Sequence, residues 1–414
     1  MKNAAKTLLF ALTLVCTMFL IYVVYPAISR RYLLRPVDNT AFQSDHWHGR
    51  PEETVLARYE EILADYHRLL TAIPRHTFKP SELFRETGPP LSSVLKNRAS
   101  KGSDSGLKRI LAWTPFFGAA DWIPKTMCDG TKKCVSTSDK NDLEISDGIV
   151  VHPRDLSDLP PVRLPHQRLI YLIQESPWAT GIDVSGYNGV FNWTVTYRLD
   201  SDIPFPFFVT TAKDKLMPEA EFNQTMQTIL QSKTKIIAYM NSNCHASHTK
   251  RLEFLYDLKA YLNVDVYGAC GNLECPRQSD VCTKTMSQYK FYLSMENSHC
   301  RDYLTEKVTE PLLQWNAVPV VMGGADPSDY EKILPPNSYI HTSGFNSARD
   351  LFEYLILLDK NPSLYAKYHY WRRTHVGNAE SSWCNLCLAL HNASLPVQTY
   401  SDFSDWYRQD TCVP

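Results

Sequence analysis

Short, continuously apolar segments alternate with segments of helical periodicity between residues 108 and 372. Apolar segments of this kind are typical of parallel strands that are buried on both faces of a sheet. We expect strands at residues 109–113, 148–152, 168–173, 234–239, 264–267, 289–294, 317–322 and 338–341. We expect helices at residues 250–262, from about residue 300, at 348–358 and at 363–372. The alternation predicts a doubly wound α/β fold with two domains, residues 108–230 and 231–372, that face a cleft.

An apolar run without any charge occupies residues 8–28. At a rise of ~1.5 Å per residue, such a run spans the ~30 Å hydrocarbon core of a membrane. A cleaved signal peptide has a shorter apolar region, of ~7–15 residues, and a cleavage site of small residues after it. We therefore predict a transmembrane signal-anchor at residues 8–28, after a short cytoplasmic tail at 1–7. The polar, poorly periodic residues 29–107 predict a stem.

Cysteines and glycosylation motifs orient the chain better than its flanking charges, because basic residues lie on both sides of the apolar run. Of the 11 cysteines only Cys16 lies in the run, so ten remain elsewhere. Three glycosylation motifs begin at Asn192, Asn223 and Asn392. Both features are typical of an oxidising secretory compartment, and they predict that the C-terminal side of the anchor lies in its lumen.

Three further patterns argue against other classes of site and partner. Cys384 and Cys387 form a C-x-x-C motif, but no second pair lies at the spacing of a zinc site, so we expect structural disulfides. His46 and His48 lie in the predicted stem without further ligands nearby, so we expect no metal site there. Lys and Arg total 43 against 44 Asp and Glu, and this balance does not favour a nucleic-acid partner.

The loop after the predicted strand at 289–294 carries the polar residues best placed for ligand binding. Ligands of open α/β sheets bind beyond the carboxyl ends of the strands. We expect Asn297 or Ser298 to cap the following helix, with three side chains on one face of its first turns: Tyr303, Glu306 and Lys307. A helix N-terminus beside a lysine suits phosphate, and a glutamate there suits sugar hydroxyls. A solvated Glu–Lys pair on a surface helix is the alternative interpretation.

Two other strand ends carry candidate side chains. The strand at 234–239 is followed by Asn241, Ser242 and Asn243, and then by Lys250 and Arg251. Asparagine side chains and a forked guanidinium can hold a base and a pyrophosphate, although the same residues are common in ordinary turns.

The strand at 168–173 ends in Gln174 and Glu175. A carboxylate at the tip of a buried strand facing a cleft is placed to act as a general base. A glutamate that stabilises a turn is the alternative.

The sequence of residues 289–307, YKFYLSMENSHCRDYLTEK, followed by VPVVMG at 318–323, resembles the signature of the α1,3-fucosyltransferases of glycosyltransferase family 10. Supporting motifs extend the resemblance across residues 108–390; they lie at 174–177, 196–203, 241–243, 267–268 and 383–387. The resemblance implies a GT-B fold and a single-pass type II anchor in the Golgi membrane. It also implies inverting transfer of L-fucose from GDP-β-L-fucose to the 3-hydroxyl of N-acetylglucosamine, in an N-glycan core or in N-acetyllactosamine. The resemblance further implies that the reaction requires no cofactor, with a divalent cation at most a stimulant.

The resemblance also assigns roles to individual residues. Glu175 matches the general base. Lys307 and Arg251 match cations that neutralise the leaving diphosphate, although Arg251 is displaced by one residue, so that Lys250 is the alternative. The other donor-binding positions are Asn297, Tyr303 and Glu306, with Tyr292, Ser242 and Asn243 lining the nucleotide site. Bridges between an early pair, Cys128 and Cys134, and a late pair, Cys384 and Cys387, would tie residues 373–414 back to the first domain; their connectivity stays open. The segment 268–277 is more similar to the invertebrate branch that fucosylates the N-glycan core.

Two alternatives to this function remain. One is a catalytically inactive glycan-binding protein of the same fold, which the presence of a base disfavours. The other is a metal-dependent glycosyltransferase acting through Asp200 and Asp202, since Asp-x-Asp motifs bind divalent ions in such enzymes. Hard-cation sites need several convergent oxygens, and only two carboxylates are visible here, so we predict no metal site.

Overall fold

The computed structural model describes residues 106–413 except 129–133, 162, 245–248, 277–278, 379–382, 393–394, 396–398 and 409–410. The predicted tail at 1–7 and anchor at 8–28, and all but the end of the stem at 29–107, lie outside the described residues, so these assignments stay predictions. Within the described part of the chain, no helix is long and apolar enough to cross a membrane.

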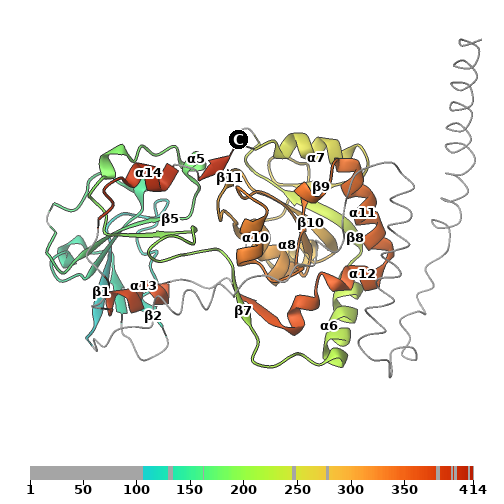
Figure 1. The fold of residues 1–414 in the computed structure, drawn as a ribbon, viewed down its shortest axis with the longest axis horizontal. Helices are drawn as coiled ribbons and strands as arrows, with labels where there is room; N and C mark the ends of the chain where they lie inside the picture. Colours follow the sequence, from blue (N-terminus) through green and yellow to red (C-terminus); the bar gives the residue numbers. More distant parts are fainter. Residues whose placement is uncertain are drawn as a thin grey trace, which may run out of the picture. The chain divides into compact units, whose positions relative to one another are not determined.

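The first sheet has six strands in the order β2-β3-β1-β4-β5-β6. Their bounds are Thr126–Met127, Cys134–Thr137, Lys108–Ala112, Gly148–Val151, Arg168–Ile173 and Trp193–Thr196. All neighbours are parallel except β2 and β3. Two helices from the end of the chain pack against it, α13 (Trp383–Leu390) and α14 (Phe403–Arg408), and they belong to separate apolar clusters that also contain alternate residues of β1, β4 and β5 (Figure 1). Both faces of the first sheet are therefore covered by helices that lie far away from its strands in the sequence.

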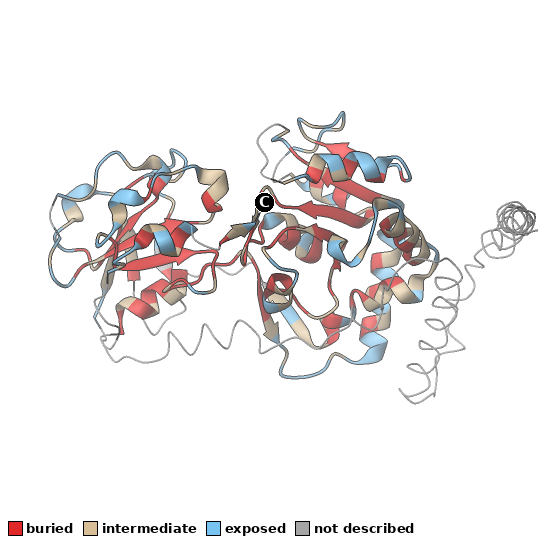
Figure 2. Ribbon diagram, turned by 45° about the horizontal axis from the view of Figure 1, so that its top comes forward, coloured by how far each residue is buried: buried red, intermediate tan, exposed pale blue. Residues whose placement is uncertain are grey.

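The second sheet has five parallel strands in the order β13-β12-β10-β8-β9. Their bounds are Ile340–His341, Val318–Met322, Tyr289–Met295, Lys235–Met240 and Asp265–Tyr267. The associated helices are α6 (Glu219–Ser232), α7 (Arg251–Lys259), α8 (Asp280–Met286), α10 (Ser328–Ile333), α11 (Ala348–Lys360) and α12 (Pro362–Lys367). Strands β4, β5, β10 and β12 are buried along almost their whole length (Figure 2), as continuous apolar segments require, and β8 is buried in its middle.

The strand order of the second sheet marks one position for a ligand. The chain runs from β8 outward to β9 and then returns to place β10 on the other side of β8. Such a reversal leaves a crevice at the carboxyl ends of the two central strands, because their following loops diverge. The loops after β8 and β10 both leave the sheet at this point.

Each predicted strand is confirmed to within two residues, so the α/β prediction holds. The helix predicted from about residue 300 is wrong. His299–Cys300 instead form a short strand, β11, which pairs with β15 (Cys412–Val413), and Asp302 adopts a left-handed conformation at φ 60°. Helix α9 begins only at Glu306 and runs to Glu310, before a π-helical turn at Pro311–Trp315. The helix predicted at 363–372 is also divided, into α12 and a 3₁₀ turn at Tyr370–Arg373.

Five disulfides pair all ten cysteines that the structure describes: Cys128–Cys384, Cys134–Cys387, Cys244–Cys270, Cys275–Cys282 and Cys300–Cys412. The first two join strands at the start of the first sheet to helix α13, across 256 and 253 residues of sequence. They are the bridges between the early and late pairs that the family resemblance implied. A further long-range contact is the antiparallel pairing of β7 (Val209–Ala212) with β14 (His375–Asn378), which joins the segment after the first sheet to the segment before α13.

We predict that the two long-range disulfides stabilise the fold non-additively. Replacing Cys128 and Cys384 by serine should cost only ~3 kcal/mol, because the neighbouring bridge still closes the long loop. Replacing the Cys134–Cys387 pair as well opens that loop, and the combined loss should reach ~8 kcal/mol in a chain-entropy estimate. Chemical denaturation of the single-bridge and double-bridge variants measures both losses.

The matched control is removal of Cys275–Cys282, which closes a loop of only seven residues elsewhere in the chain. Its removal should lower the free energy of unfolding by ~2 kcal/mol, and this loss should add to the loss measured for removal of either long-range bridge. A combined loss equal to the sum of the two single-bridge losses would contradict the shared-loop interpretation.

Candidate active site

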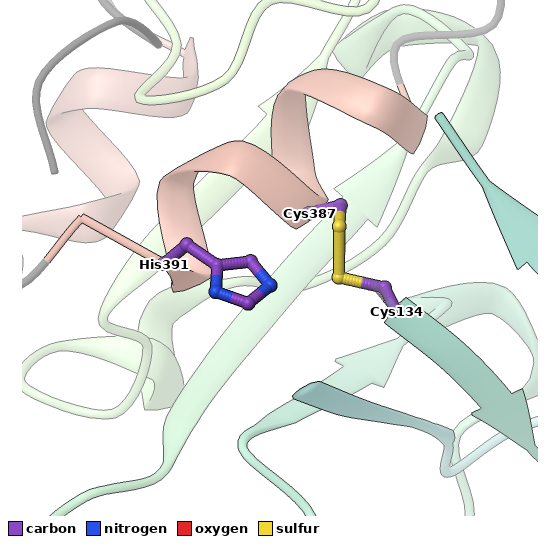
Figure 3. A group of neighbouring side chains, drawn as sticks. All are labelled: Cys134, Cys387 and His391. Atoms are coloured by element: carbon purple, nitrogen blue, oxygen red, sulfur yellow. A yellow bond between two sulfur atoms is a disulfide. The ribbon is translucent and has the colours of Figure 1, made fainter. Parts of the chain in front are cut away.

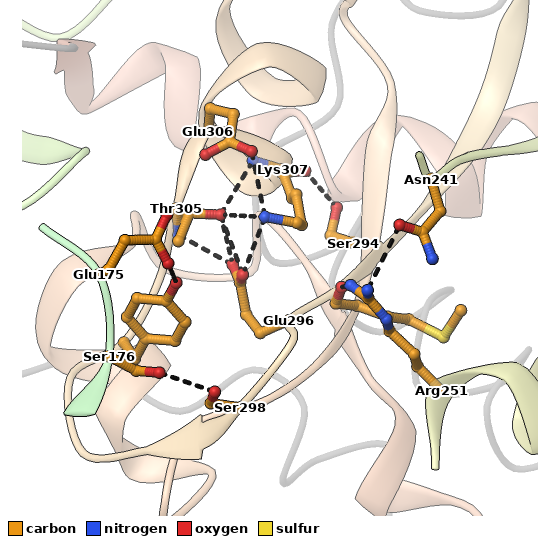
Figure 4. A network of polar contacts seen from close by, with 12 residues as sticks. Glu175, Ser176, Asn241, Arg251, Ser294, Glu296, Ser298, Thr305, Glu306 and Lys307 are labelled. Carbon is orange, nitrogen blue, oxygen red and sulfur yellow. Dashed lines mark hydrogen bonds and ion pairs between the residues drawn. The ribbon is translucent and has the colours of Figure 1, made fainter. Parts of the chain in front are cut away.

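Two hydrogen bonds join the end of strand β5 to the loop after strand β10 (Figure 4). Ser176 donates its hydroxyl to the hydroxyl oxygen of Ser298 at 2.7 Å, and both side chains are fully buried. Tyr303 donates its phenolic hydroxyl to Oε2 of Glu175 at 3.1 Å. Ser176 also caps the short helix α5 (Pro177–Thr180) by accepting from the amide of Ala179. The residue predicted to be a general base is therefore held beside the loop predicted to bind the donor.

A buried carboxylate, Glu296, organises the loop after β10. Its side chain is 0% exposed and accepts hydrogen bonds from the amide of Thr305 at 2.8 Å and from the Thr305 hydroxyl at 2.9 and 3.0 Å. The ammonium of Lys307 lies 3.3 Å from Oε2 of Glu296. Burial raises the pKa of Glu296, and the positive charge of Lys307 opposes that rise. Sequence reasoning assigned no role to Glu296, although a carboxylate that directly follows a buried strand was the available signal.

Lys307 places a fixed positive charge next to Glu296, at the end of strand β10. It is mostly buried, and its ammonium also contacts the hydroxyl of Thr305 at 2.9 Å and the carboxylate of Glu306 at 3.0 Å. Burial alone would favour the neutral amine, but the carboxylates of Glu296 and Glu306 raise the pKa of Lys307 above its ordinary value. The side chain therefore carries its charge throughout the physiological pH range.

The predicted caps of the following helix are wrong. Thr305 caps α9, since its hydroxyl accepts from the amide of Lys307, whereas Ser298 bonds to Ser176. Tyr303 lies before the helix, so the expected helical face shared by Tyr303, Glu306 and Lys307 does not exist. The segment between Ser298 and Thr305 is held in a non-helical conformation by the β11–β15 pairing, which local sequence does not reveal. The structure nevertheless brings Tyr303 and Lys307 to the same site through Glu175 and Glu296.

Arg251 and Lys250 have different environments. Arg251 is 2% exposed, and its guanidinium donates to the carbonyls of Asn243 and Met295 and to the side chain of Asn241 at 3.1–3.4 Å. It braces the carboxyl ends of β8 and β10 against each other. Lys250 is exposed at the start of α7 and lines a pocket. Of the two cations that the sequence left as alternatives, Lys250 is the one with a side chain on the pocket wall.

The remaining predicted donor residues are placed less uniformly. Ser242 and Asn243 are exposed in the loop after β8, where Asn243 donates its amide to the side chain of Asn241. Asn297 is half-buried, and its side-chain oxygen accepts no hydrogen bond from the described residues. Tyr292 lies in the core instead, packed on Trp315 with ring centroids 4.9 Å apart. The structure does not bring Tyr292 to the surface of the loops.

A pocket of about 850 Å³ lies next to these loops. Its lining comes from α5, from the loop before α7, from β11, from the end of β12 and from α14: Pro177, Trp178, Gly181, Thr249, Lys250, His299, Met322 and Arg408. The volume is within the range of small-molecule sites, and no carboxylate is among the lining residues. Trp178 and Arg408 were not singled out in the sequence, where neither belongs to a recognisable motif.

The carboxylates of the Asp-x-Asp motif are engaged by the protein itself. Asp200 accepts from Arg198 at 2.6 and 2.8 Å and from Arg301 at 2.8 Å. Asp202 accepts from the amide of Thr194 at 2.9 Å and from the hydroxyl of Tyr400 at 2.6 Å. These bonds join the end of β6 to the loop after β10 and to the C-terminal segment, so the motif acts as a scaffold in this structure.

Within the described part of the chain, one group of potential metal ligands comes together: Cys134, Cys387 and His391 (Figure 3). The two sulfurs are bonded to each other, so neither is a thiolate that could coordinate an ion. The group is part of the disulfide core that holds α13 to the first sheet.

The three glycosylation motifs differ in accessibility. Asn192 is 2% exposed, and its side-chain oxygen accepts from the amide of Leu169 at 2.9 Å. Asn392 is also buried. Asn223 lies on α6 with its side chain partly exposed. A glycan needs a surface asparagine, so only Asn223 is compatible with modification of the folded chain.

Comparison with known proteins gives consistent matches over both sheets. Residues 105–208 match the family model of the fucosyltransferase N-terminal domain, and residues 230–406 match that of glycosyltransferase family 10 (fucosyltransferase), C-terminal domain. The chain is 34% identical over 334 residues to α-(1,3)-fucosyltransferase C of Drosophila melanogaster, covering 72% of this chain and 77% of that protein. It is 40% identical over 221 residues to glycoprotein 3-α-L-fucosyltransferase A of the same organism, covering 52% of this chain and 43% of that protein.

A solved structure described as α1,3-fucosyltransferase with GDP-fucose is also similar. It is 14% identical, with a TM-score of 0.47, and the match covers 73% of this chain and 98% of that one.

We predict that Lys307→Met makes stability depend steeply on pH. The substitution leaves Glu296 buried without a counter-charge, which typically costs ~3–5 kcal/mol at neutral pH. A carboxyl whose pKa is raised in the folded state is tolerated when protonated, so the stability of the variant is retained near pH 5 and falls as pH rises toward 8. Thermal unfolding across this pH range measures the effect.

The matched control is the double variant Lys307→Met with Glu296→Gln, which removes the buried charge. It should recover most of the stability at pH 8 and lose the steep dependence. If Lys307→Met alone has the same melting temperature as wild type at every pH, the Lys307–Glu296 ion pair does not stabilise the fold.

We also predict that Asn223 carries an N-linked glycan and that Asn192 and Asn392 do not. Removal of glycans from protein secreted by eukaryotic cells, followed by peptide mass analysis, identifies the modified asparagine. Asn223→Gln should abolish the mobility shift without loss of stability. Asn192→Gln should leave the shift and lower the stability, because the Leu169 amide loses its buried acceptor. Occupancy at Asn192 would contradict the burial argument.

Proposed function

This chain belongs to glycosyltransferase family 10, the fucosyltransferases, and we propose that it transfers L-fucose from GDP-β-L-fucose to the 3-hydroxyl of N-acetylglucosamine in glycoprotein N-glycans. The observation that carries the proposal is the hydrogen bond from Tyr303 to Glu175, which orients the proposed base and joins it to the segment that leads to the buried cation Lys307. Pro177 and Trp178, which follow Glu175 in the sequence, line a pocket with no acidic residue among its lining residues. The names of the Drosophila relatives support the α1,3 linkage and a glycoprotein acceptor.

Glu175 acts as the general base in the proposed reaction. It removes the proton of the acceptor hydroxyl while that oxygen attacks C1 of fucose. The bond between C1 and the β-phosphate oxygen breaks in the same step, and GDP leaves with its electron pair. Attack from the face opposite GDP converts the β-linked donor into an α-fucoside. The hydrogen bond from Tyr303 to one carboxylate oxygen fixes the orientation of the base.

Lys307 and Lys250 neutralise the charge that develops on the leaving diphosphate. Lys307 is held protonated by two carboxylates, and Lys250 lies on the wall of the pocket. Removing a group that stabilises developing charge typically lowers turnover ~100- to 1,000-fold. Arg251 supports the site indirectly, since its guanidinium holds the carboxyl ends of β8 and β10 together. With protein cations in this role, the reaction is proposed to need no divalent ion.

The acceptor side of the site is proposed to include an aromatic loop after strand β1. Phe117 is 57% exposed with a left-handed backbone at φ 47°, an uncommon conformation for a bulky residue. Asp155 holds the loop, because its carboxylate accepts from the amides of Phe117 and Gly118 and contacts the ring of His152 at 2.6 Å. Exposed aromatic rings suit the faces of sugars. The loop leaves the same edge of the first sheet as Glu175, because β1 and β5 are both parallel to β4.

The cellular context of the proposal is the Golgi membrane. The apolar run at residues 8–28 would anchor the chain as a type II protein, with the described residues in the lumen. Five disulfides support an oxidising compartment, since cytosolic proteins rarely keep such bonds.

The proposed function is tested by transfer of labelled fucose from GDP-fucose with the detergent-solubilised full-length chain. The acceptors are an N-glycan core with an exposed innermost N-acetylglucosamine and N-acetyllactosamine, each with and without EDTA. We expect an α1,3-linked product by NMR, and transfer that survives EDTA. Glu175→Gln should lower turnover ~100- to 10,000-fold, because it loses the general base.

The control is Tyr303→Phe, which keeps the base and removes only its orienting hydrogen bond, so its loss should be smaller. Transfer that disappears with EDTA would favour metal-assisted chemistry. Full activity in Glu175→Gln would remove that residue from the mechanism. The preferred acceptor identifies the branch.

A further inference from the structure

The C-terminal helix α14 presents a cation to the pocket that the proposed mechanism does not use. Arg408, the last residue of α14, is exposed and lines the pocket together with Lys250 and Trp178. Its guanidinium donates to the carbonyl of Ile182, just beyond Gly181, which also lines the pocket. The two cations come from different parts of the chain, Lys250 from the start of α7 and Arg408 from the C-terminal segment.

The charge balance of the pocket selects an anionic ligand. Lys250 and Arg408 are the basic side chains among its lining residues, and no acidic residue is among them. One carboxylate, Asp183, lies near Arg408 outside the lining: its pKa is lowered by hydrogen bonds from Ser185 and also by the charge of Arg408. His299 adds no charge at neutral pH, since burial lowers its pKa. The other lining side chains include Trp178, Pro177 and Met322, which are apolar. An arginine and a lysine on one pocket are suited to a diphosphate, because a guanidinium makes forked hydrogen bonds to phosphate oxygens.

Arg408 is held in place from two directions. Phe403 and Tyr407 of α14 are buried in the core of the first sheet, and buried Arg198 donates to the carbonyl of Trp406 and lies 4.4 Å above its ring. Beyond α14, Cys412 is bonded to Cys300, and the carbonyl of Thr411 accepts from the amide of Arg301 at 2.6 Å. The same loop after β10 carries Glu296 and Ser298.

We propose that Arg408 is a donor-binding residue that contacts the diphosphate of GDP-fucose, and that the Cys300–Cys412 disulfide holds it at the pocket. The inference rests on the proposed function, because that function supplies the nucleoside diphosphate. It adds a contact from the C-terminal segment to a site otherwise built from the loops after β5, β8 and β10. The segment thereby takes part in donor recognition as well as in packing.

The test measures binding of GDP, GMP and guanosine to the full-length chain by calorimetry, without acceptor and without turnover. Arg408→Gln should weaken GDP binding about 10- to 100-fold, as expected for loss of a charged hydrogen bond, and leave guanosine binding unchanged. Arg408→Lys should recover part of the affinity for GDP. The matched control is Arg349→Gln, which changes an exposed arginine on α11 that does not line the pocket and should leave all three affinities unchanged.

A second pair of variants tests whether the Cys300–Cys412 disulfide positions Arg408. Replacing Cys300 and Cys412 by serine should weaken GDP binding to a similar extent as Arg408→Gln, and combining the two changes should produce little additional loss. Additive losses would overturn the role of the disulfide in positioning Arg408. Unchanged GDP affinity in Arg408→Gln would overturn the donor-binding role.

The outcomes separate this inference from the proposed function. If the wild-type chain binds no GDP, the proposed donor is wrong. If it binds GDP and transfers fucose while Arg408→Gln behaves as wild type, only the inference fails.

Discussion

A single buried carboxylate sets the geometry of the site. Glu296 follows the central strand β10 and is completely enclosed, so every one of its acceptor positions must be satisfied from nearby. The amide and hydroxyl of Thr305 and the ammonium of Lys307 meet that need. The loop between them must fold back to bring these donors to the strand end, and this return fixes where α9 begins. It also places Tyr303 against Glu175 and holds Lys307 in its charged form. The positions of Tyr303 and Lys307 and the start of α9 therefore depend on the same buried carboxylate.

Strands were predicted well because burial on both faces leaves a local record in the sequence. Residues 169–173, for example, are apolar without interruption, whereas a helix at a protein surface needs apolar residues on one face only. The loop after β10 was predicted badly for the opposite reason. Its conformation depends on Cys412, which lies 112 residues away from Cys300, and on the enclosure of Glu296 by Thr305. A charged residue at a strand end ordinarily suggests solvent, and the neighbouring residues do not indicate that the chain covers it.

The same limit explains the Asp-x-Asp motif. Asp200 looks available for a divalent ion when only its neighbours are considered, but Arg301 approaches it from a distant loop and Arg198 from two residues before. The family resemblance predicted roles for Glu175 and Lys307 without giving the contacts that orient them. Tyr292 shows the converse, because the resemblance placed it at the nucleotide site and the fold buries it against Trp315. Residue roles transferred by motif specify which side chain is present, and packing determines what it contacts.

The covering of the first sheet by α13 and α14 has a consequence for biosynthesis. Cys128 and Cys134 leave the ribosome more than 250 residues before their partners, Cys384 and Cys387. At ordinary elongation rates of ~5–20 residues per second, they wait roughly 10–50 seconds as free thiols. During that interval the helices α13 and α14 do not yet exist, and the apolar faces they will cover remain open. Folding of the first sheet therefore depends on synthesis of residues 383–408, and a stop codon before α13 would leave both faces of the sheet uncovered and Cys128 and Cys134 without their partners.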